Sequence, residues 1–202
     1  MDMQDVETIK KSYESRGFHF DYFETVEEAL NYINTIIPID ATLGFGGSET
    51  VKEIGLLSAL EGRVLLHRSL FPDDQKEEIL AKMHYADWYV SSANALCETG
   101  DIVNIDGRGN RVGEIVNGPK KILIVAGVNK IVPDIAAGIE RTRNVSSPKN
   151  SRRLNKNTPC ATLDKCCYCN SKDTICKATV ILHHPMTGTE VYVVVINKSL
   201  GY

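Results

Sequence analysis

Two hydrophobic periodicities alternate along roughly the first 145 residues. Helices are expected over residues 4–16, from the capping box of Thr25 and Glu28 to Ile37, over 73–83 and over 133–143. Strands are expected at residues 18–22, about 42, 63–67, 87–91 and 121–125. The run Lys121–Val125 is continuously apolar, which is typical of a strand buried on both faces. This alternation predicts an α/β domain with a largely parallel sheet.

The composition changes after Val145. Residues 146–159 are polar and contain two prolines, so we expect an extended connection there. A cysteine-rich loop follows, and the two apolar runs within residues 178–197, joined by a Pro-Met-Thr-Gly-Thr turn, predict a terminal β-hairpin. We therefore divide the chain into a ligand-binding core over residues 1–145 and a second part over residues 146–202, whose linker, cysteine loop and hairpin pack on the core.

Overall composition is that of a soluble globular protein, with 43% hydrophobic and 24% charged residues. The formal net charge of −3 gives no electrostatic footprint for nucleic acid, and the short basic run Lys149–Lys156 is typical of a solvated loop. The first residues lack the apolar stretch of a secretory signal, and the run Ile122–Val128 is far shorter than the roughly 20 residues that span a bilayer. We expect a cytoplasmic protein without a membrane span.

A glycine-rich turn over Leu43–Gly55 leads from a strand directly into a helix. Such a turn can direct backbone N–H groups at an anionic or carbonyl ligand. The pattern is neither the dinucleotide fingerprint nor a P-loop, so it predicts neither NAD nor ATP. The alternative is a tight connection that binds nothing. The ligand-binding candidates from this turn are Gly44, Gly46, Gly47 and Ser48.

Polar side chains recur at the ends of the expected strands between Ser91 and Asp134. A buried strand does not need amide, carboxylate and guanidinium groups at its ends, so we interpret them as a site. The ligand-binding candidates are Asn94, Asn104, Asn110, Arg111, Asn129 and Lys130, and the acid–base candidates are Glu98 and Asp106. Because ligands of parallel sheets bind at the carboxyl ends of strands, we expect these groups and the glycine turn to share one cleft. The alternative is a series of turns in which these residues bind no ligand.

Five of the six cysteines lie between Cys160 and Cys176, with the spacing C-x5-C-C-x-C-x6-C. In a reducing cytosol this pattern favours metal binding over disulfides. Four thiolates satisfy either a zinc ion or an iron–sulfur cluster. The expected ligands are Cys160, Cys166, Cys169 and Cys176, with Cys167 as the alternative member. Reduced or vicinally oxidised thiols are the competing interpretation.

Five segments together resemble the LUD (lactate utilization) domain family in its short stand-alone form: GFGGSETVKEIG, ANALCETGDIVNIDGRGNRV, GPKKILIVAGVNKIV, the pattern P-x-N-x-x-R-L at Pro148–Leu154, and PCATLDKCCYCNSKDTIC. The resemblance implies a Rossmann-like fold similar to the superfamily of glucosamine-6-phosphate deaminase, ribose-5-phosphate isomerase and CoA-transferases. It also implies a link to L-lactate oxidation beside iron–sulfur partner subunits, which favours a cluster over zinc. This chain departs from the family at Cys97, where Thr or Ser is usual.

Three functions are compatible with these patterns. The first is a redox-associated subunit that holds a small anionic metabolite and relays electrons through an iron–sulfur cluster. In it the residues 44–48 turn with Lys130 or Arg111 binds a carboxylate, and Glu98 or Asp106 is the base. The second is a non-redox isomerase or acyl- or CoA-transferase-like enzyme that uses the same pocket. The third is a non-catalytic subunit with a structural zinc loop. A monomer and a homo-oligomer both remain open.

Overall fold

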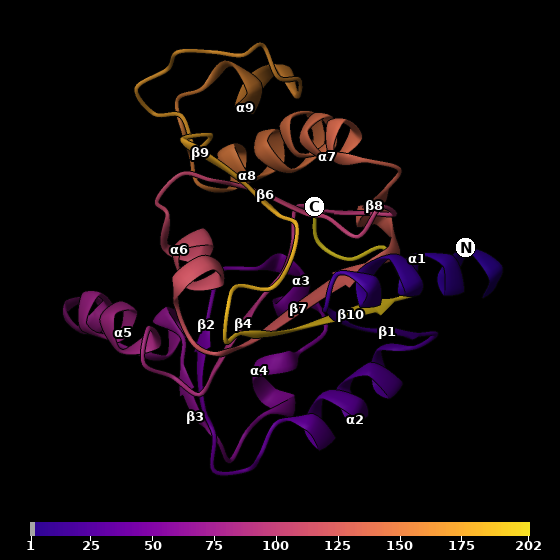
Figure 1. The fold of residues 1–202 in the computed structure, drawn as a ribbon. Coiled ribbons are helices and arrows are strands. Elements are labelled where there is room, and N and C mark those ends of the chain that lie inside the picture. Colours follow the sequence, from indigo (N-terminus) through magenta and orange to yellow (C-terminus); the bar gives the residue numbers. More distant parts are fainter. Residues whose placement is uncertain (1–2) are drawn as a thin grey trace.

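A six-stranded parallel sheet forms the centre of the computed structural model, which describes residues 3–202 (Figure 1). All five neighbouring pairs of strands run parallel. Across the sheet the strands are β1 (His19–Phe23), β10 (Glu190–Ile196), β7 (Lys121–Gly127), β4 (Trp88–Ser91), β2 (Thr42–Phe45) and β3 (Val64–Leu66). The predicted α/β class and the Rossmann-like sheet are confirmed.

Helices cover both faces of this sheet. One face packs on α1 (Met3–Ser15), α5 (Lys76–Met83) and α6 (Asn110–Asn117), and the other on α2 (Val26–Ile36), α3 (Glu49–Glu53) and α4 (Leu56–Ala59). Side chains of β7 alternate between the two cores, with Ile122 and Ile124 on the first face and Leu123 and Val125 on the second. Because successive residues of a strand point to opposite faces, only a continuous apolar run can fill both cores.

A second, four-stranded sheet lies above the first and carries most of the polar segment (Figure 1). Its order is β8 (Ile131–Val132), β5 (Ala95–Cys97), β6 (Ile102–Asp106) and β9 (Ala178–Leu182). The helix α7 (Ile135–Arg141) packs Ile135 and Ile139 on the small core under β5 and β6. A π-helical turn at Thr142–Ser146 joins α7 to α8 (Ser147–Arg153), and α9 (Pro159–Leu163) follows. The described chain also has 3₁₀ turns at Arg68–Leu70, Asp73–Gln75 and Val128–Lys130.

The local signals for the starts of α2 and α3 are confirmed. Thr25 and Glu28 form the reciprocal capping box of α2, and the Ser48 hydroxyl accepts a hydrogen bond from the Val51 N–H at the start of α3. The Asp134 side chain caps α7 in the same way, accepting from Ala137. No helix in residues 3–202 is both long and apolar enough to cross a membrane.

The predicted terminal β-hairpin is wrong. The strand β9 pairs with β6 in the small sheet, whereas β10 lies between β1 and β7 in the large sheet. Two apolar strands joined by a tight turn satisfy the hairpin pattern locally, but each strand here finds a partner that is distant in sequence. The last strand is therefore part of the core sheet and does not pack on it from outside.

The expected extended connection after Val145 is also wrong, because residues 147–153 form α8. Pro148 lies in the first turn of this helix, where its missing N–H costs no hydrogen bond. The small residues Ser147, Pro148 and Ser151 are buried against the rest of the protein. The basic run that begins at Lys149 is consequently helical over much of its length, and it presents side chains to the cleft described next.

Candidate functional site

A cleft of about 910 Å³ opens beside the carboxyl ends of β2 and β6. The turn after β2 contributes Gly46, Gly47 and Ser48, and the end of β6 contributes Asp106. Asn110 and Arg111 come from α6, and Asn150 and Arg153 come from α8. The glycine turn and Asp106 thus share one cleft. The turn lies at the carboxyl end of the parallel strand β2, whereas Asp106 comes from β6, which runs antiparallel to both of its neighbours.

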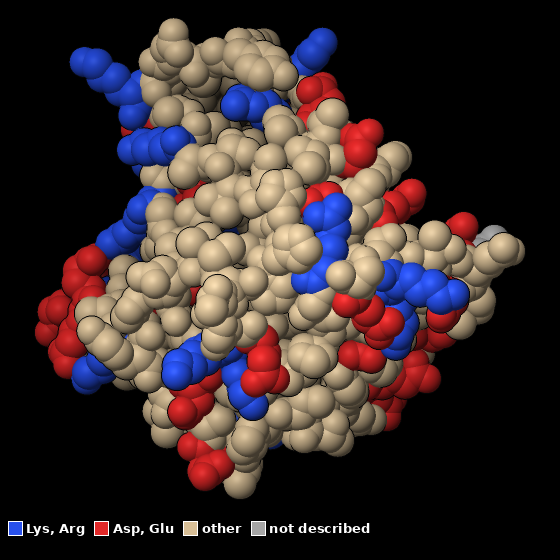
Figure 2. Space-filling model, in the orientation of Figure 1, with Lys and Arg blue, Asp and Glu red and all other residues tan. Residues whose placement is uncertain are grey.

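Positive charge dominates the lining of this cleft. Nine lysine and arginine residues line it, against the three carboxylates of Glu49, Asp106 and Asp173. The nine are Lys52, Arg68, Lys76, Arg108, Arg111, Arg153, Lys156, Lys172 and Lys177. Figure 2 shows Lys and Arg side chains gathered along the hollowed left edge of the molecule, between the cysteine segment above and α5 below. A concave surface with such an excess of cations attracts anions.

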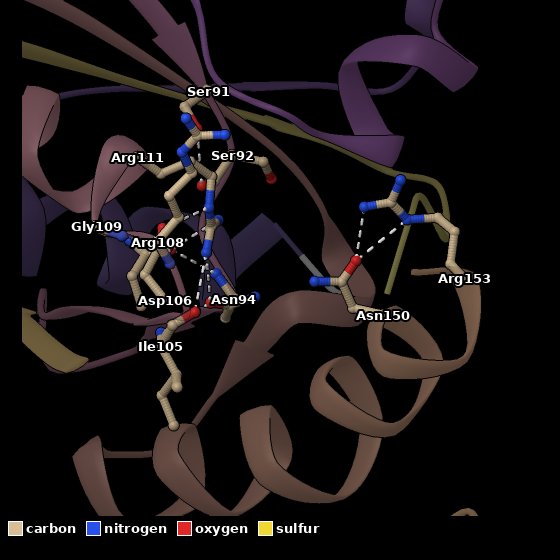
Figure 3. Close-up of polar contacts among 11 residues, drawn as sticks. Ser91, Ser92, Asn94, Ile105, Asp106, Arg108, Gly109, Arg111, Asn150 and Arg153 are labelled. Carbon is tan, nitrogen blue, oxygen red and sulfur yellow. Dashed lines mark hydrogen bonds and ion pairs between the residues drawn. The ribbon is translucent and has the colours of Figure 1, made fainter. Parts of the chain in front are cut away.

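Arg111 is the most firmly held of these cations. Its Nε lies 3.2 Å from Asp106 Oδ2, and its two other nitrogens donate to the side chains of Asn104 (3.3 Å) and Asn94 (3.2 Å). A fourth bond of 3.0 Å runs to the carbonyl oxygen of Ile105. Figure 3 shows the guanidinium group at the centre of these partners. The strand ends therefore fix the orientation of one planar donor group, which is the kind of group that recognises carboxylates and phosphates.

Both oxygens of the Asp106 carboxylate are already engaged. Oδ1 accepts hydrogen bonds from the backbone N–H groups of Arg108 (2.9 Å) and Gly109 (3.0 Å), and Oδ2 faces Arg111. Only 6% of the residue is exposed. This geometry lets Asp106 position Arg111 and the following turn. Its role as an acid or base remains a prediction.

The four candidates of the glycine turn have different positions. Gly44 lies within β2, where an added Cβ would meet Met83 of α5 at 3.0 Å, so it faces a helix and does not line the cleft. The Gly46 N–H donates to the Val90 carbonyl at 2.9 Å, and an added Cβ would lie 2.6 Å from the Tyr89 hydroxyl. The small size of Gly46 therefore serves packing. Gly47 has open space around it, and it lines the cleft together with Gly46 and Ser48.

A smaller hollow of about 70 Å³, here called the annex, shares part of its lining with the cleft, including Gly47, Ser48, Arg111 and Arg153. Lys130, which is 4% exposed, lines the annex. Its Nζ lies 3.1 Å from both Ser92 Oγ and the Ala93 carbonyl oxygen. Burial, followed by the charges of Arg141 and Arg111, lowers the pKa of Lys130 to about 7.

Glu98 and Asn129 do not join this arrangement. The strand β5 begins next to Asn94 at the annex and ends at Cys97, so Glu98 lies beyond its far end, roughly 13 Å along an extended chain. Its side chain is exposed, and it lines neither hollow. The predicted convergence is wrong for Glu98. The Asn129 side chain instead bonds to the backbone of Leu200 at 3.0 and 3.4 Å. The same β5 buries Cys97 in the small core, and burial raises the pKa of its thiol to about 12.

The sequence interpretation missed most of the cations of the cleft and also missed Ser92. Two signals were available: the basic run Lys149–Lys156, which by itself is typical of a solvated loop, and the family pattern P-x-N-x-x-R-L, which contains Asn150 and Arg153. Arg153 is held by Asn150 Oδ1 at 2.7 and 3.1 Å and lies 3.5 Å from Glu49. Figure 3 shows Arg153 and Arg111 on different sides of the site. Both arginines line the same cleft only because α8 folds back over the sheet, and no local sequence pattern reveals that packing.

The cysteine side chains do not form a ready coordination shell. Within residues 3–202 no group of three or more Cys, His, Asp or Glu side chains is arranged to hold a metal ion. Cys160 is buried beside Thr158 and Ser151, the Cys176 thiol lies 3.3 Å from Ser147 Oγ, and all six cysteines are free. Desolvation, followed by the charges of Cys169, Cys166 and Cys160, raises the pKa of Cys167, so several of these thiols lie within electrostatic range of one another.

Metal binding by this segment remains a prediction. We expect protein purified without oxygen to carry close to one iron–sulfur cluster or one zinc ion per chain, because four thiolates on a short segment can close around a metal as it binds. The measurement is iron, sulfide and zinc content. Changing both Cys166 and Cys169 to Ser should remove the metal, whereas Cys167→Ser should retain it because four cysteines of the segment remain. Less than about a tenth of an equivalent in the unchanged protein would contradict the prediction.

Comparisons with known proteins agree with this fold. The family model described as LUD domain matches residues 6–196. A solved structure titled as a DUF162 family protein from Deinococcus radiodurans superposes with a TM-score of 0.57 at 13% identity, and the match covers 96% of each chain. At that identity the likeness shows the fold alone. No curated protein matches the chain.

Proposed function

The chain belongs to the LUD domain family, which is linked to lactate utilization, and we propose that its cleft binds a small anionic metabolite. The observation that carries this proposal is the excess of Lys and Arg residues along one concavity, nine in all, of which five pair with a carboxylate. One of them, Arg111, is held by four hydrogen bonds. The hollow of about 910 Å³ is within the range of small-molecule sites, which runs from about 300 to 1,000 Å³.

Two arginines from different elements supply the recognition. Arg111 is 16% exposed at its side chain and Arg153 is 45% exposed, so Arg111 offers a fixed, largely desolvated charge while Arg153 can adjust to the ligand. A carboxylate or phosphate takes paired hydrogen bonds from a guanidinium group, and such bonds are about twice as strong as neutral ones. Four N–H groups of Arg111 already bond to the protein, so Arg111 can add a single bond, and the paired bonds come from Arg153. The side chains at the ends of β6 and around Asn94 orient Arg111 before any ligand arrives, which reduces the cost of binding.

We expect Arg153→Met to weaken anion binding at least tenfold. The probes are L-lactate, inorganic phosphate, ribose 5-phosphate and acetyl-CoA, each added in a thermal-shift titration to the complete chain. A ligand at a hundredfold excess over its Kd stabilises the folded state by about 2.7 kcal/mol, which gives a readable rise in Tm. Arg152→Met is the matched control, because Arg152 lies on the same helix but pairs with Asp164 outside the cleft. Equal binding by the two variants, or no shift with any probe, would contradict the proposal.

Electron relay is a finer proposal for the same protein. In it, an iron–sulfur cluster held by the cysteine segment, or by partner subunits, would accept the electrons of hydroxy-acid oxidation. The proximity of several thiols in the segment supports it. The isomerase or transferase alternative uses the cleft without that cluster, and the non-catalytic alternative predicts zinc in the segment. A brown colour of the anaerobic protein favours the relay, and colourless protein with zinc favours the structural role.

A further inference from the structure

The annex holds a serine and a buried lysine in direct contact. Ser92 directly follows β4, a central strand of the parallel sheet, so its hydroxyl lies at the carboxyl edge where parallel sheets place reactive groups. Both side chains line the annex, and both are nearly inaccessible, at 3% for Ser92 and 4% for Lys130. The 3.1 Å between Ser92 Oγ and Lys130 Nζ is a hydrogen-bond distance.

Lys130 lacks the partner that a buried ammonium group usually has. Among residues 3–202 no carboxylate forms an ion pair with it. Arg141 of α7 and Arg111 of α6 disfavour its charged form, and Glu53 of α3 favours it. Glu49 of α3 and Arg153 of α8 also line the annex. The Glu53 carboxylate also accepts a hydrogen bond of 2.7 Å from the Gly201 N–H. Burying an unpaired cation beside two guanidinium groups is expensive, so the neutral amine becomes accessible near neutral pH.

A neutral amine can use both contacts of Lys130. As an ammonium group, Lys130 donates to both Ser92 Oγ and the Ala93 carbonyl oxygen, and the Ser92 hydroxyl donates to the Ala93 carbonyl oxygen at 3.4 Å. Once the amine is neutral, one N–H can still donate to Ala93, and the Ser92 hydroxyl can turn to donate its proton to the nitrogen lone pair. A hydroxyl that donates to a neighbouring base is an activated nucleophile, and serine–lysine pairs of this kind occur on unrelated folds. If Lys130 only held residues 92–93 in place by packing, an apolar side chain of similar length would do so without the cost of desolvating a charged group. The presence of an amine therefore favours a chemical role.

We propose that Ser92 and Lys130 are a nucleophile and its general base, which accept the acyl group of an anionic ester or thioester bound in the cleft. The pair rests on the proposed anion binding, because the annex shares its lining with the cationic cleft. In the step, Ser92 Oγ forms a bond to the acyl carbon while Lys130 takes the hydroxyl proton. The ester or thioester bond then breaks, and the leaving alcohol or thiol takes that proton. Water, or a second acceptor with a hydroxyl or thiol group, releases the acyl group from Ser92.

The test uses a small alkyne-bearing alkyl fluorophosphonate on the complete chain, with the site of labelling located by peptide mass spectrometry. We expect labelling of Ser92 at pH 8, at a rate that rises with pH around a midpoint near 7 because the neutral amine is required. Lys130→Met should slow labelling at least tenfold, and Lys130→Arg should do the same because a guanidinium group stays protonated. Ser91→Ala is the matched control, since Ser91 is buried in β4 next to Ser92 and should leave labelling unchanged.

Three results would overturn the pair: no label on Ser92 at pH 8.5, a label on another residue in its place, or an unchanged rate in the two Lys130 variants. The pH profile of the unchanged protein tests the base even if a Lys130 variant fails to fold. Phosphate titration separates this proposal from anion binding, because Ser92→Ala should lose the label and keep its affinity for phosphate. Labelling of Ser92 in a protein that binds none of the four anions would keep Ser92 and Lys130 as nucleophile and base, but it would refute the anionic acyl donor together with the proposed function.

Discussion

A chain that stops at residue 187 is expected to lose its cooperative fold. The missing strand β10 lies between β1 and β7, and Val191, Val193, Val194, Val195 and Ile196 are each 0% exposed. Fully burying one such side chain contributes about 1.5–3 kcal/mol. Five of them therefore contribute on the order of 10 kcal/mol, which is comparable with the whole stability of a domain. The loss would also leave the facing edges of β1 and β7 without hydrogen-bond partners.

The measurement is thermal and urea unfolding followed by circular dichroism. Val193→Ala in the complete chain is the graded control. It should keep a single cooperative transition and lose about 2 kcal/mol, since it removes two methyl groups from the core and keeps the strand. A cooperative transition in the shortened chain, at the midpoint of the complete one, would mean that residues 188–202 pack outside a self-sufficient core, as the hairpin interpretation requires.

Replacing Asp101 by Asn is expected to destabilise the protein by about 3 kcal/mol at pH 7, because it breaks a buried charge cluster. Asp101 is 2% exposed and accepts bonds from Arg16 (2.9 and 3.2 Å), Thr99 (2.6 Å) and His183 (2.6 Å). These groups come from α1, from the turn between β5 and β6, and from the segment after β9, so the carboxylate joins parts of the chain that are distant in sequence. An amide keeps the shape but removes the charge that the three donors share.

The pH dependence of this effect has a definite sign. Burial alone would raise the pKa of Asp101, but the hydrogen bonds from Thr99 and His183 and the charge of Arg16 leave it below the ordinary value. A carboxyl whose pKa is lowered by folding contributes stability above its unfolded pKa, near 3.9, and loses that contribution as the pH falls through the folded pKa. The difference between the unchanged protein and Asp101→Asn should therefore shrink as the pH falls below about 4.

Urea unfolding at pH 7, 5 and 3 measures this difference. Asp40→Asn is the control, because Asp40 is exposed and its replacement should change the unfolding free energy by less than about 0.5 kcal/mol at every pH. A penalty for Asp101→Asn that stays constant from pH 7 to pH 3 would show that the charge is not its cause. A penalty below about 1 kcal/mol at pH 7 would show that the cluster is not a buried one in solution.

The sequence predicts which residues share the site only where a general rule of folding relates segments that are distant along the chain. The rule that parallel strands end at one edge placed the turn at Gly47 correctly, because β2 belongs to the parallel sheet. Asp106 reaches the same cleft from β6, which runs antiparallel to both of its neighbours, so the rule does not account for it. The rule failed for Glu98, because β5 belongs to the second sheet and carries Glu98 away from the cleft. The rule also says nothing about Arg153, because Arg153 reaches the cleft from α8, a helix that folds back over the sheet.

The sequence by itself determined the class of structure and the starts of its helices. Hydrophobic periodicity and helix caps depend on residues that are close in sequence. The capping box at Thr25 and the continuous apolar run of β7 can therefore be recognised without tertiary information. Pairing is different, because the apolar pattern of β10 is satisfied equally by a hairpin and by a place inside a sheet. Only the competition among all strands for partners put β10 between β1 and β7 and β9 beside β6. The same long-range packing brought Ser92 to Lys130, 38 residues apart, and excluded the water that would otherwise keep that amine charged.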